Sequence, residues 1–302
     1  MNYSPLVSVV LTSYNHLALL QRSFQCLLEQ EYTNIEIVIV DDGSTDGSRE
    51  WITQIATQYP QKVNFFLQAQ NVGVSANKSK GFQLAKGELI TYLDGDDLYY
   101  SNKIKDEVAV FAQNPTVDVV YSNFVFCDEQ GNVFRQWAKD AEKMPQGFIL
   151  KEIITRAFPY NTLFRFELMK RQVIEKIQYY RHELSAYEDW DGRIRYADFA
   201  QIAYSGTVGA AYTFNPQGIS KTMRRKQLLT IQEAVFNDNF LLCKKHYSPQ
   251  ECNAMYTMMA QKFSRANLKL DTQKLSTKRL AKVWQHWRQF PHDWKVFYSF
   301  FV

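Results

Sequence analysis

The sequence contains few cysteines and no long apolar run, and both absences exclude classes of protein. Its four cysteines are widely scattered, so they form neither a CxxC pair nor the dense framework of a secreted disulfide-rich domain. No uninterrupted apolar stretch reaches the roughly 18 residues that a helix needs to cross a bilayer. The first residues, MNYSPLVSVV, lack the basic start and long apolar core of a signal peptide. We therefore expect reduced thiols and a cytoplasmic protein that at most attaches to the inner face of the cell membrane.

Charge is distributed unevenly, although the net charge of the 302 residues is only +4. Residues 221–302 contain 15 Lys and Arg against 5 Asp and Glu, which leaves 20 against 26 for residues 1–220. Hydrophobic residues make up 46% of the chain, enough for a substantial core, so a globally disordered chain is excluded. The charge change predicts two regions, 1–220 and 221–302.

Short apolar runs alternate with helical patterns in the first part of the chain. The apolar runs are Leu6–Leu11, Ile35–Val40, Val63–Leu67 and Leu89–Leu93. Between them apolar residues recur every three or four positions, which predicts helices. Continuous apolar strands separated by helices are typical of a parallel sheet covered on both faces and built by right-handed crossovers. The sequence therefore predicts an α/β, Rossmann-like domain, and the helical periodicity after residue 221 predicts a helical C-terminal extension.

Polar clusters directly follow three of the predicted strands. They are Thr12–Asn15, Asp41–Ser44 and Asp94–Asp97. In an open parallel sheet the carboxyl ends of the strands border the ligand crevice. We therefore expect the three clusters to lie together along one edge of the sheet.

The sequence Asp94-Gly95-Asp96-Asp97 places three carboxylates in four residues, and their repulsion requires a positive partner. A divalent cation is one such partner, because Mg²⁺ binds carboxylate oxygens and shares its remaining ligands with substrate phosphates. The alternative is a turn that caps the helix predicted to begin near Ser101, where one Asp would suffice. The metal site is the better interpretation for Asp94 and Asp96, whereas Asp97 fits both.

Two further acidic clusters have both a structural and a functional interpretation. Turn and capping chemistry explains Gly43, Ser44 and Asp46, whereas Asp42 at the strand end favours hydrogen bonds to a ligand. The segment YEDWDGRIR places acidic residues in a predicted first helical turn, where they are ordinary partners of the helix dipole. Taken alone, Asp189 in this segment is only a weak candidate for a catalytic base.

These motifs, in this order, resemble family 2 glycosyltransferases, which are inverting enzymes with a GT-A fold that use nucleotide-sugars. The resemblance rests on VDDGSTDGS followed by LDGDD, together with NVGVSANKSKGFQLAKGE, NTLFRFELM and YEDWDGRIR. It covers about the first two thirds of the chain and weakens after residue 220. It implies a GT-A fold and a metal-dependent transfer of sugar to an acceptor hydroxyl.

The resemblance also implies how the donor nucleotide is held. Tyr14 would stack on the base, with Thr12 beside it. Asp42 would hydrogen-bond the base, with Asp41 next to it. Lys78 would lie near the diphosphate. A UDP-sugar is the favoured donor.

The same resemblance assigns the reaction chemistry to three aspartates. Asp96 would bind Mg²⁺ or Mn²⁺ directly, and Asp94 would contact the ribose or the metal as part of the same DXD motif. Asp189 would be the general base that accepts the proton of the attacking hydroxyl. The implied acceptor is a glycan or lipid-linked glycan, in the synthesis of bacterial cell-surface glycans or polysaccharides.

The chain departs from the family pattern at two places. The family usually has Ala-Arg-Asn where this chain has Asn77-Lys78-Ser79, so a point charge replaces the bidentate fork of arginine. A common Tyr-Arg-x-His pattern is Tyr212-Thr213-Phe214-Asn215 here, which offers a neutral amide. The basic residues Lys221, Arg224, Arg225 and Lys226 follow, either as compensation or as a solvated helix face.

These departures keep an alternative open, a nucleotide-sugar-binding module with weak or no catalysis. A second alternative is a phosphotransferase of the haloacid dehalogenase type with Asp94 as its nucleophile. Its signature normally follows the first strand, whereas here three strand–helix units come first, and Leu98 replaces the usual Thr or Val.

The end of the chain combines basic and aromatic residues in KRLAKVWQHWRQFPHDWKVFYSFFV. This combination predicts contact with an anionic membrane surface. Packing on the catalytic domain or against a second copy is an equal alternative. A nucleic-acid partner is not expected, because the chain lacks a clustered basic recognition motif.

Overall fold

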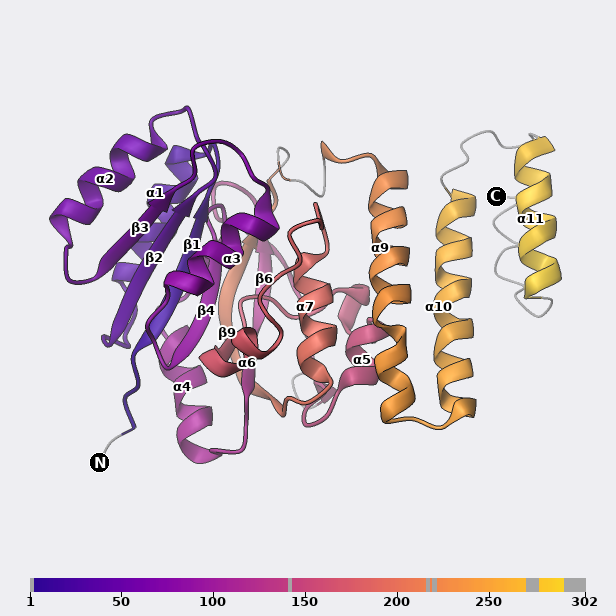
Figure 1. The fold of residues 1–302 in the computed structure, drawn as a ribbon. Helices are drawn as coiled ribbons and strands as arrows, with labels where there is room; N and C mark the ends of the chain where they lie inside the picture. Colours follow the sequence, from indigo (N-terminus) through magenta and orange to yellow (C-terminus); the bar gives the residue numbers. More distant parts are fainter. Residues whose placement is uncertain (1–2, 141–142, 216–217, 219–221, 270–276, 291–302) are drawn as a thin grey trace. The chain divides into compact units, whose positions relative to one another are not determined.

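The computed structural model describes residues 3–140, 143–215, 218, 222–269 and 277–290 (Figure 1). The chain divides into two compact units, residues 1–217 and 218–302. The assignment of catalysis to residues 1–220 stays a prediction.

The four predicted strands of the first unit lie side by side as one parallel part of a nine-stranded sheet. These strands are β1 (Val7–Ser13), β2 (Ile35–Asp41), β3 (Val63–Leu67) and β4 (Leu89–Asp94). Their order in the sheet is β3-β2-β1-β4, and all three pairings are parallel. Nearly all side chains of β1, β2 and β4 are buried, as expected for strands that helices cover on both faces of the sheet.

Five further strands extend the sheet beyond β4. They are β5 (Leu98–Tyr99), β6 (Val119–Cys127), β7 (Val133–Gln136), β8 (Leu168–Lys170) and β9 (Ile202–Thr213). The short β8 is antiparallel to both β4 and β6, whereas β6 and β9 are parallel. Strands β5 and β7 pair antiparallel with β9 and β6. The sheet is therefore mixed at this end, where the sequence shows no simple alternation of strands and helices.

Helices cover both faces of the parallel strands (Figure 1). The helices of the first unit are α1 (Leu17–Leu28), α2 (Ser48–Gln58), α3 (Val74–Leu84), α4 (Lys103–Gln113), α5 (Leu150–Ile154), α6 (Arg171–Lys176) and α7 (Glu188–Ala197), with the 3₁₀ turn η2 (Pro159–Asn161). The α1 and α2 helices lie on one face, where Phe24 meets Trp51 edge-on at 5.5 Å. The α3 helix packs on the opposite face, against β1 and β2.

The strand order fixes where a ligand can bind. The chain runs from β1 outward to β3 and then returns to the other side of β1, so the connections on the two sides of β1 leave in opposite directions. In open α/β sheets such a switch point opens a crevice at the carboxyl ends of the strands. In this register Thr12 lies opposite Asp94 and Ser13 lies opposite Asp41, so the three polar clusters share one edge, as predicted.

The second unit is helical, as its periodicity predicts. Its elements are α9 (Arg225–Asn239), the 3₁₀ turn η3 (Phe240–Lys245), α10 (Pro249–Lys269) and α11 (Thr277–Gln289). The ring of Phe236 on α9 contacts the rings of Phe240, Tyr256 and Phe263, which joins α9 to α10. Within the described part of the chain, no helix has the length and apolarity required to traverse a bilayer.

Replacing Gly81 with alanine tests how closely α3 packs on the sheet. A Cβ atom at this position would lie 2.3 Å from Cγ1 of Val10 and 3.3 Å from the methyl groups of Val40. Alanine favours helices by about 1 kcal/mol over glycine, but overpacking a core costs about 1–3 kcal/mol. The difference between these two terms is a loss of up to about 2 kcal/mol, so we expect Gly81→Ala to lower the free energy of unfolding by up to this amount in urea titrations. Gln83→Ala, at an exposed position of the same helix, is the control and should change it little.

Candidate active site

The centre of the site is a buried cation at the end of β4. The Nζ atom of Lys78 lies 2.9 Å from Oδ1 of Asp94 and 3.6 Å from Oε1 of Glu188. It also lies 4.2 Å from the centre of the Tyr92 ring. Thr12 on β1 donates a hydrogen bond of 3.1 Å to the same Asp94 oxygen. Residues of β1, α3, β4 and α7 therefore meet around one positive charge.

Burial shifts the proton equilibria of this cluster. Burial by itself lowers the pKa of Lys78, but Asp94 and Glu188 outweigh it, so the net pKa is raised and the ammonium stays charged. Burial raises the pKa of Glu188, with Lys78 opposing and Asp189 and Asp94 reinforcing the shift. A lysine that is 2% exposed is tolerated only because carboxylates surround it.

The other two aspartates of the DGDD sequence make different contacts. Oδ2 of Asp96 accepts a hydrogen bond of 2.9 Å from the side-chain amide of Asn215. Asp97 is fully buried and accepts a hydrogen bond of 2.7 Å from the backbone N–H of Thr213 on β9. None of the three caps the following helix α4, whose N-cap residue is Asn102. Asp97 therefore has a structural role, because its hydrogen bond fastens the turn to β9. In this it differs from Asp94 and Asp96, which are partly exposed.

Only glycine fits between Asp94 and Asp96. A Cβ atom on Gly95 would lie 2.3 Å from the carbonyl oxygen of Thr12 and 2.6 Å from Nε2 of His16. Real Cβ atoms essentially never approach other atoms so closely. The close contact brings the loop after β4 directly onto the loop after β1.

The predicted nucleotide-binding residues surround this corner. The Tyr14 ring is 45% exposed, so a base can stack on it. Asp41 accepts hydrogen bonds from the backbone N–H and the hydroxyl group of Ser44 at 2.9 and 2.5 Å. Asp42 accepts hydrogen bonds from the backbone N–H groups of residues 72 and 73 at 2.7 and 3.0 Å, while burial raises its pKa. Both carboxylates therefore also hold loops in place.

Asp189 lies in the first turn of α7, directly after Glu188. Its Oδ2 atom accepts a hydrogen bond of 2.6 Å from Nη1 of Arg193, and its Oδ1 atom accepts one of 2.7 Å from the Trp190 backbone N–H. Burial by itself raises the pKa of Asp189, but Arg193 and Arg165 outweigh it and hold the pKa well below its usual range. The carboxylate is therefore ionised at neutral pH.

Arg193 is itself held rigidly. Its guanidinium donates to both carboxylate oxygens of Glu167 at 3.0 and 2.8 Å and to the Tyr92 hydroxyl group at 2.9 Å. Tyr92 also packs under Lys78, so this network connects Asp189 to the Asp94 corner. Lys78 is near enough to contribute to the lowered pKa of Asp189. The predicted base and the predicted metal site thus belong to one network.

Asp189 also opens into a small cavity of about 70 Å³. The cavity is lined by Tyr187, Trp190 and three arginines, Arg156, Arg165 and Arg193, among other residues. Arg165 lies 4.2 Å from the centre of the Tyr212 ring, and its Nε atom is buried without a hydrogen-bond partner in the described part of the chain. The surroundings of Asp189 are therefore strongly positive.

The carboxylates fit a metal ion only as part of a shared site. Within the described residues no group of three or more His, Cys, Asp or Glu side chains is arranged to hold a metal. Asp94 and Asp96 each keep one oxygen, Oδ2 and Oδ1, that accepts no hydrogen bond from another described residue. Mg²⁺ and Mn²⁺ bind carboxylate oxygens and complete their shells with substrate phosphates. The donor set therefore fits a cation that arrives with a diphosphate.

Sequence reasoning missed several members of this network. They are Tyr92, Arg165, Glu167 and Arg193. Arg193 could have been found, because it follows Asp189 by four residues on one helix and this spacing places the two side chains on the same face. Arg165 and Glu167 lie before the short strand β8, in the segment NTLFRFELM. This segment contributes to the family resemblance, but it has no clear periodic pattern that would assign a role to either residue.

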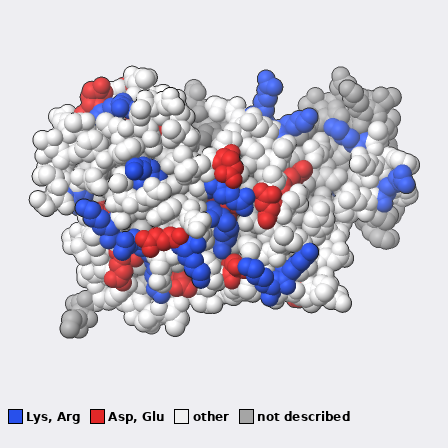
Figure 2. Space-filling model, in the orientation of Figure 1, with Lys and Arg blue, Asp and Glu red and all other residues white. Residues whose placement is uncertain are grey.

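Both signs of charge occur on the surface of the first unit. Figure 2 shows basic and acidic side chains next to one another on the face that it presents.

Comparison with known proteins identifies the family. The model of the family "Glycosyl transferase family 2" matches residues 8–172. A glycosyltransferase of Nostoc is 33% identical over 174 residues, which cover 57% of this chain and 52% of that protein. The glycosyltransferase GlyG of Streptococcus pneumoniae is 31% identical over 183 residues, which cover 58% of this chain and 60% of that protein. The match thus spans about half the length of the relatives.

Solved structures share the fold. TarS of S. aureus in complex with UDP-GlcNAc has a TM-score of 0.63 at 16% identity, covering 94% of this chain and 89% of that one. The mannosyltransferase PcManGT from Pyrobaculum calidifontis, in complex with GDP-Man and Mn²⁺, has a TM-score of 0.60 at 16% identity. The match covers 99% of this chain and 84% of that one. These similarities confirm the predicted GT-A fold. Because the family model matches more than half of the chain, the protein belongs to glycosyl transferase family 2.

Proposed function

We propose that the protein is a metal-dependent inverting glycosyltransferase that moves a sugar from a nucleotide-sugar to an acceptor hydroxyl group. The observation that carries this proposal is the network joining Asp94 at the switch point of the sheet to Asp189 on α7 through Lys78, Tyr92 and Arg193. This network places the polar crevice at the carboxyl ends of the strands and the ionised carboxylate of Asp189 in one site. Family membership supports the reaction class.

The donor would bind along the strand ends. The exposed ring of Tyr14 offers a surface for the base, and Thr12, Asp41 and Asp42 border the same edge. A UDP-sugar is the favoured donor. Two structural neighbours are complexes with UDP-GlcNAc and GDP-Man, which supports a nucleotide-sugar and leaves the choice of base to experiment.

Asp94 and Asp96 would hold Mg²⁺ or Mn²⁺, and the neighbour with Mn²⁺ supports a divalent cation. A bound cation acts as a Lewis acid that neutralises charge developing on a departing diphosphate. Lys78 prevents the repulsion between Asp94 and Glu188 when no donor is present. As a point charge it compensates these carboxylates without the bidentate geometry of arginine.

Asp189 would accept the proton of the acceptor hydroxyl as that oxygen attacks the anomeric carbon. Its lowered pKa ensures that it is ionised, and the hydrogen bond from Arg193 fixes its orientation. One displacement without a covalent intermediate inverts the anomeric configuration. The implied acceptor is a glycan or lipid-linked glycan of bacterial surface polysaccharide synthesis.

The two alternatives fare differently. The haloacid dehalogenase-type alternative is wrong, because the chain belongs to another family and Asp94 ends the fourth strand rather than the first. A binding module with weak catalysis has some support, because Asn215 occupies one oxygen of Asp96 and Arg193 holds the proposed base. The variant Asp189→Asn distinguishes a transferase from a binding module with weak catalysis.

The proposed membrane contact concerns a segment that is only partly described, since residues 291–302 lie outside the described ranges. In α11, the side chains of Trp284 and Trp287 are 59% and 45% exposed, and Arg288 stacks on Trp284 at 4.6 Å. Exposed tryptophans beside cations are typical of helices that lie at a membrane surface. Peripheral membrane attachment therefore stays part of the proposal.

Asp189→Asn removes the proposed base while keeping the shape of the side chain. We expect transfer to fall by about 10²–10⁴-fold, the usual contribution of a general base. Nucleotide binding, measured as the rise in melting temperature with UDP, should persist. Glu183→Gln, an exposed position before the same helix, is the control. Unchanged transfer in the Asp189 variant would remove the general base from the account.

Asp96→Ala tests the metal site. We expect a UDP-sugar to raise the melting temperature of the native protein more with Mn²⁺ than with EDTA, because ligands that bind the folded state stabilise it. The variant should lose this metal-dependent increment. Asp140→Ala, at an exposed acidic position, should keep it. An increment of equal size in the Asp96 variant would argue against this residue as a ligand.

The paired substitution Trp284→Ala and Trp287→Ala tests the membrane contact. We expect the variant to co-sediment less with vesicles that contain anionic lipid than the native protein does, because interfacial anchoring by tryptophan is lost. Vesicles of neutral lipid are the control. Equal partitioning of both proteins would dismiss the contact.

A further inference from the structure

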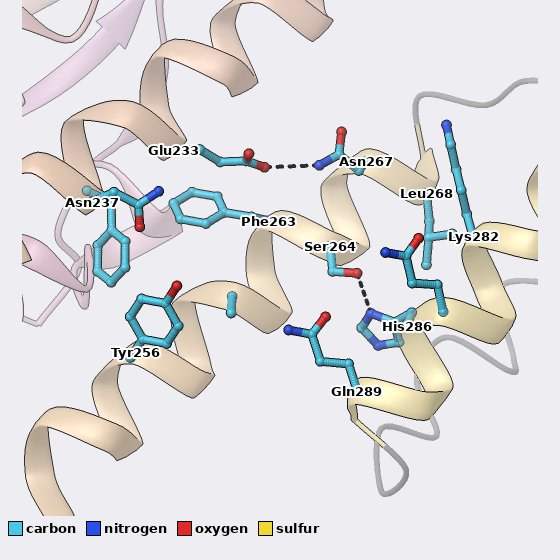
Figure 3. Close-up of a pocket in the computed structure, with 13 residues that line it drawn as sticks. Glu233, Asn237, Tyr256, Phe263, Ser264, Asn267, Leu268, Lys282, His286 and Gln289 are labelled. Atoms are coloured by element: carbon cyan, nitrogen blue, oxygen red, sulfur yellow. Dashed lines mark hydrogen bonds between the residues drawn. The ribbon is translucent and has the colours of Figure 1, made fainter.

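The second unit contains a pocket that the proposed reaction does not use. It has a volume of about 360 Å³ and is lined by residues of α9, α10 and α11 (Figure 3). Small-molecule sites commonly measure roughly 300–1,000 Å³. All of its lining residues belong to the second unit, and none belongs to the candidate active site.

One part of the lining is aromatic. Phe236 and Phe263 are buried and contact each other with ring centres 5.7 Å apart. Tyr256 contacts Phe236 at 5.9 Å but is 46% exposed. The buried ring of Phe236 holds Tyr256 in place. The partly exposed Tyr256 therefore lines the pocket beside the two buried phenylalanines.

The rest of the lining is polar and mostly uncharged. Asn267 donates a hydrogen bond of 3.0 Å to Glu233, and the Ser264 hydroxyl group lies 2.6 Å from Nδ1 of His286 (Figure 3). These two pairs fix side chains of α9 and α11 to α10. Three other amide side chains line the pocket from exposed positions, namely Asn237, Gln285 and Gln289. Each carries both hydrogen-bond donors and an acceptor.

The charge of the lining is balanced. The pocket contains one acidic residue, Glu233, and one lysine, Lys282. A phosphorylated ligand would require a cluster of basic side chains, and an acyl chain would require a uniformly apolar lining. Amides beside an aromatic ring instead match a molecule with hydroxyl groups at its edge and C–H groups on its face.

We propose that this pocket binds a neutral saccharide, with the C–H face of a sugar ring against Tyr256 and the hydroxyl groups on the amides. Resting on the proposed function, the saccharide is part of the acceptor glycan. The second unit then selects the acceptor by holding one of its sugar units, while the first unit binds the donor.

Saturation-transfer NMR on the full chain tests the pocket. The probes are cellobiose, lactose and N,N′-diacetylchitobiose, each measured with UDP in excess so that the donor site is filled. We expect at least one of them to receive saturation from the protein. The double variant Asn237→Ala and Gln285→Ala should weaken that binding about tenfold, as the loss of two hydrogen bonds predicts.

Asn253→Ala is the matched control, because it removes an exposed amide from α10 outside the pocket and should leave binding unchanged. Gln289→Ala is a second pocket variant and should weaken binding on its own. No saturation transfer to any probe, or transfer that persists in both pocket variants, would overturn the proposal.

The same variants separate this proposal from the proposed reaction. Hydrolysis of the donor sugar and stabilisation by UDP should remain at native levels in the pocket variants, because no active-site residue changes. Loss of saccharide binding with donor hydrolysis intact supports the acceptor pocket. Saccharide binding that survives in Asp189→Asn, with transfer unaffected there, would contradict the reaction and leave the pocket standing.

Discussion

The ion cluster around Lys78 is the interaction on which the site depends. A buried ammonium is unfavourable unless carboxylates surround it, and here they come from two different elements, Asp94 on β4 and Glu188 on α7. Removing the cation would leave the buried Glu188 and the partly exposed Asp94 without their shared positive partner. The cluster therefore fixes α7, and with it Asp189, relative to the carboxyl end of the sheet.

A second layer of contacts gives this arrangement its rigidity. Tyr92 lies under Lys78 and hydrogen-bonds Arg193, which in turn holds both Glu167 and Asp189. The same arginine lowers the pKa of Asp189, so the orientation of the carboxylate and its charge have one origin. These contacts fix the position of the Asp189 carboxylate and keep it ionised, and both properties are used by the general base that we propose.

Much of this fold could be predicted, because the four parallel strands β1 to β4 are continuous apolar runs and three of them are followed by a polar cluster. The carboxyl-edge location of Thr12, Asp41 and Asp94 followed from topology alone. The burial of Lys78 could not be predicted, because one of its partners, Glu188, lies far along the chain and a lysine in a helix ordinarily faces water. The roles of Glu167 and Arg165 were also hidden, since their segment has no periodicity and their positions depend on β8 pairing with β4 and β6.

We propose that Asp94, Asp96 and the diphosphate of the donor share one cation, which lies opposite Asp189. A crystal structure of the protein with UDP and Mn²⁺, with the metal located by its anomalous scattering, tests this most directly. We predict a Mn²⁺ peak in direct contact with a carboxylate oxygen of Asp96 and with oxygens of the diphosphate, with Asp189 facing the position of the anomeric carbon. A metal bound away from Asp94 and Asp96, or an Asp189 carboxylate turned away from the diphosphate, would contradict the account.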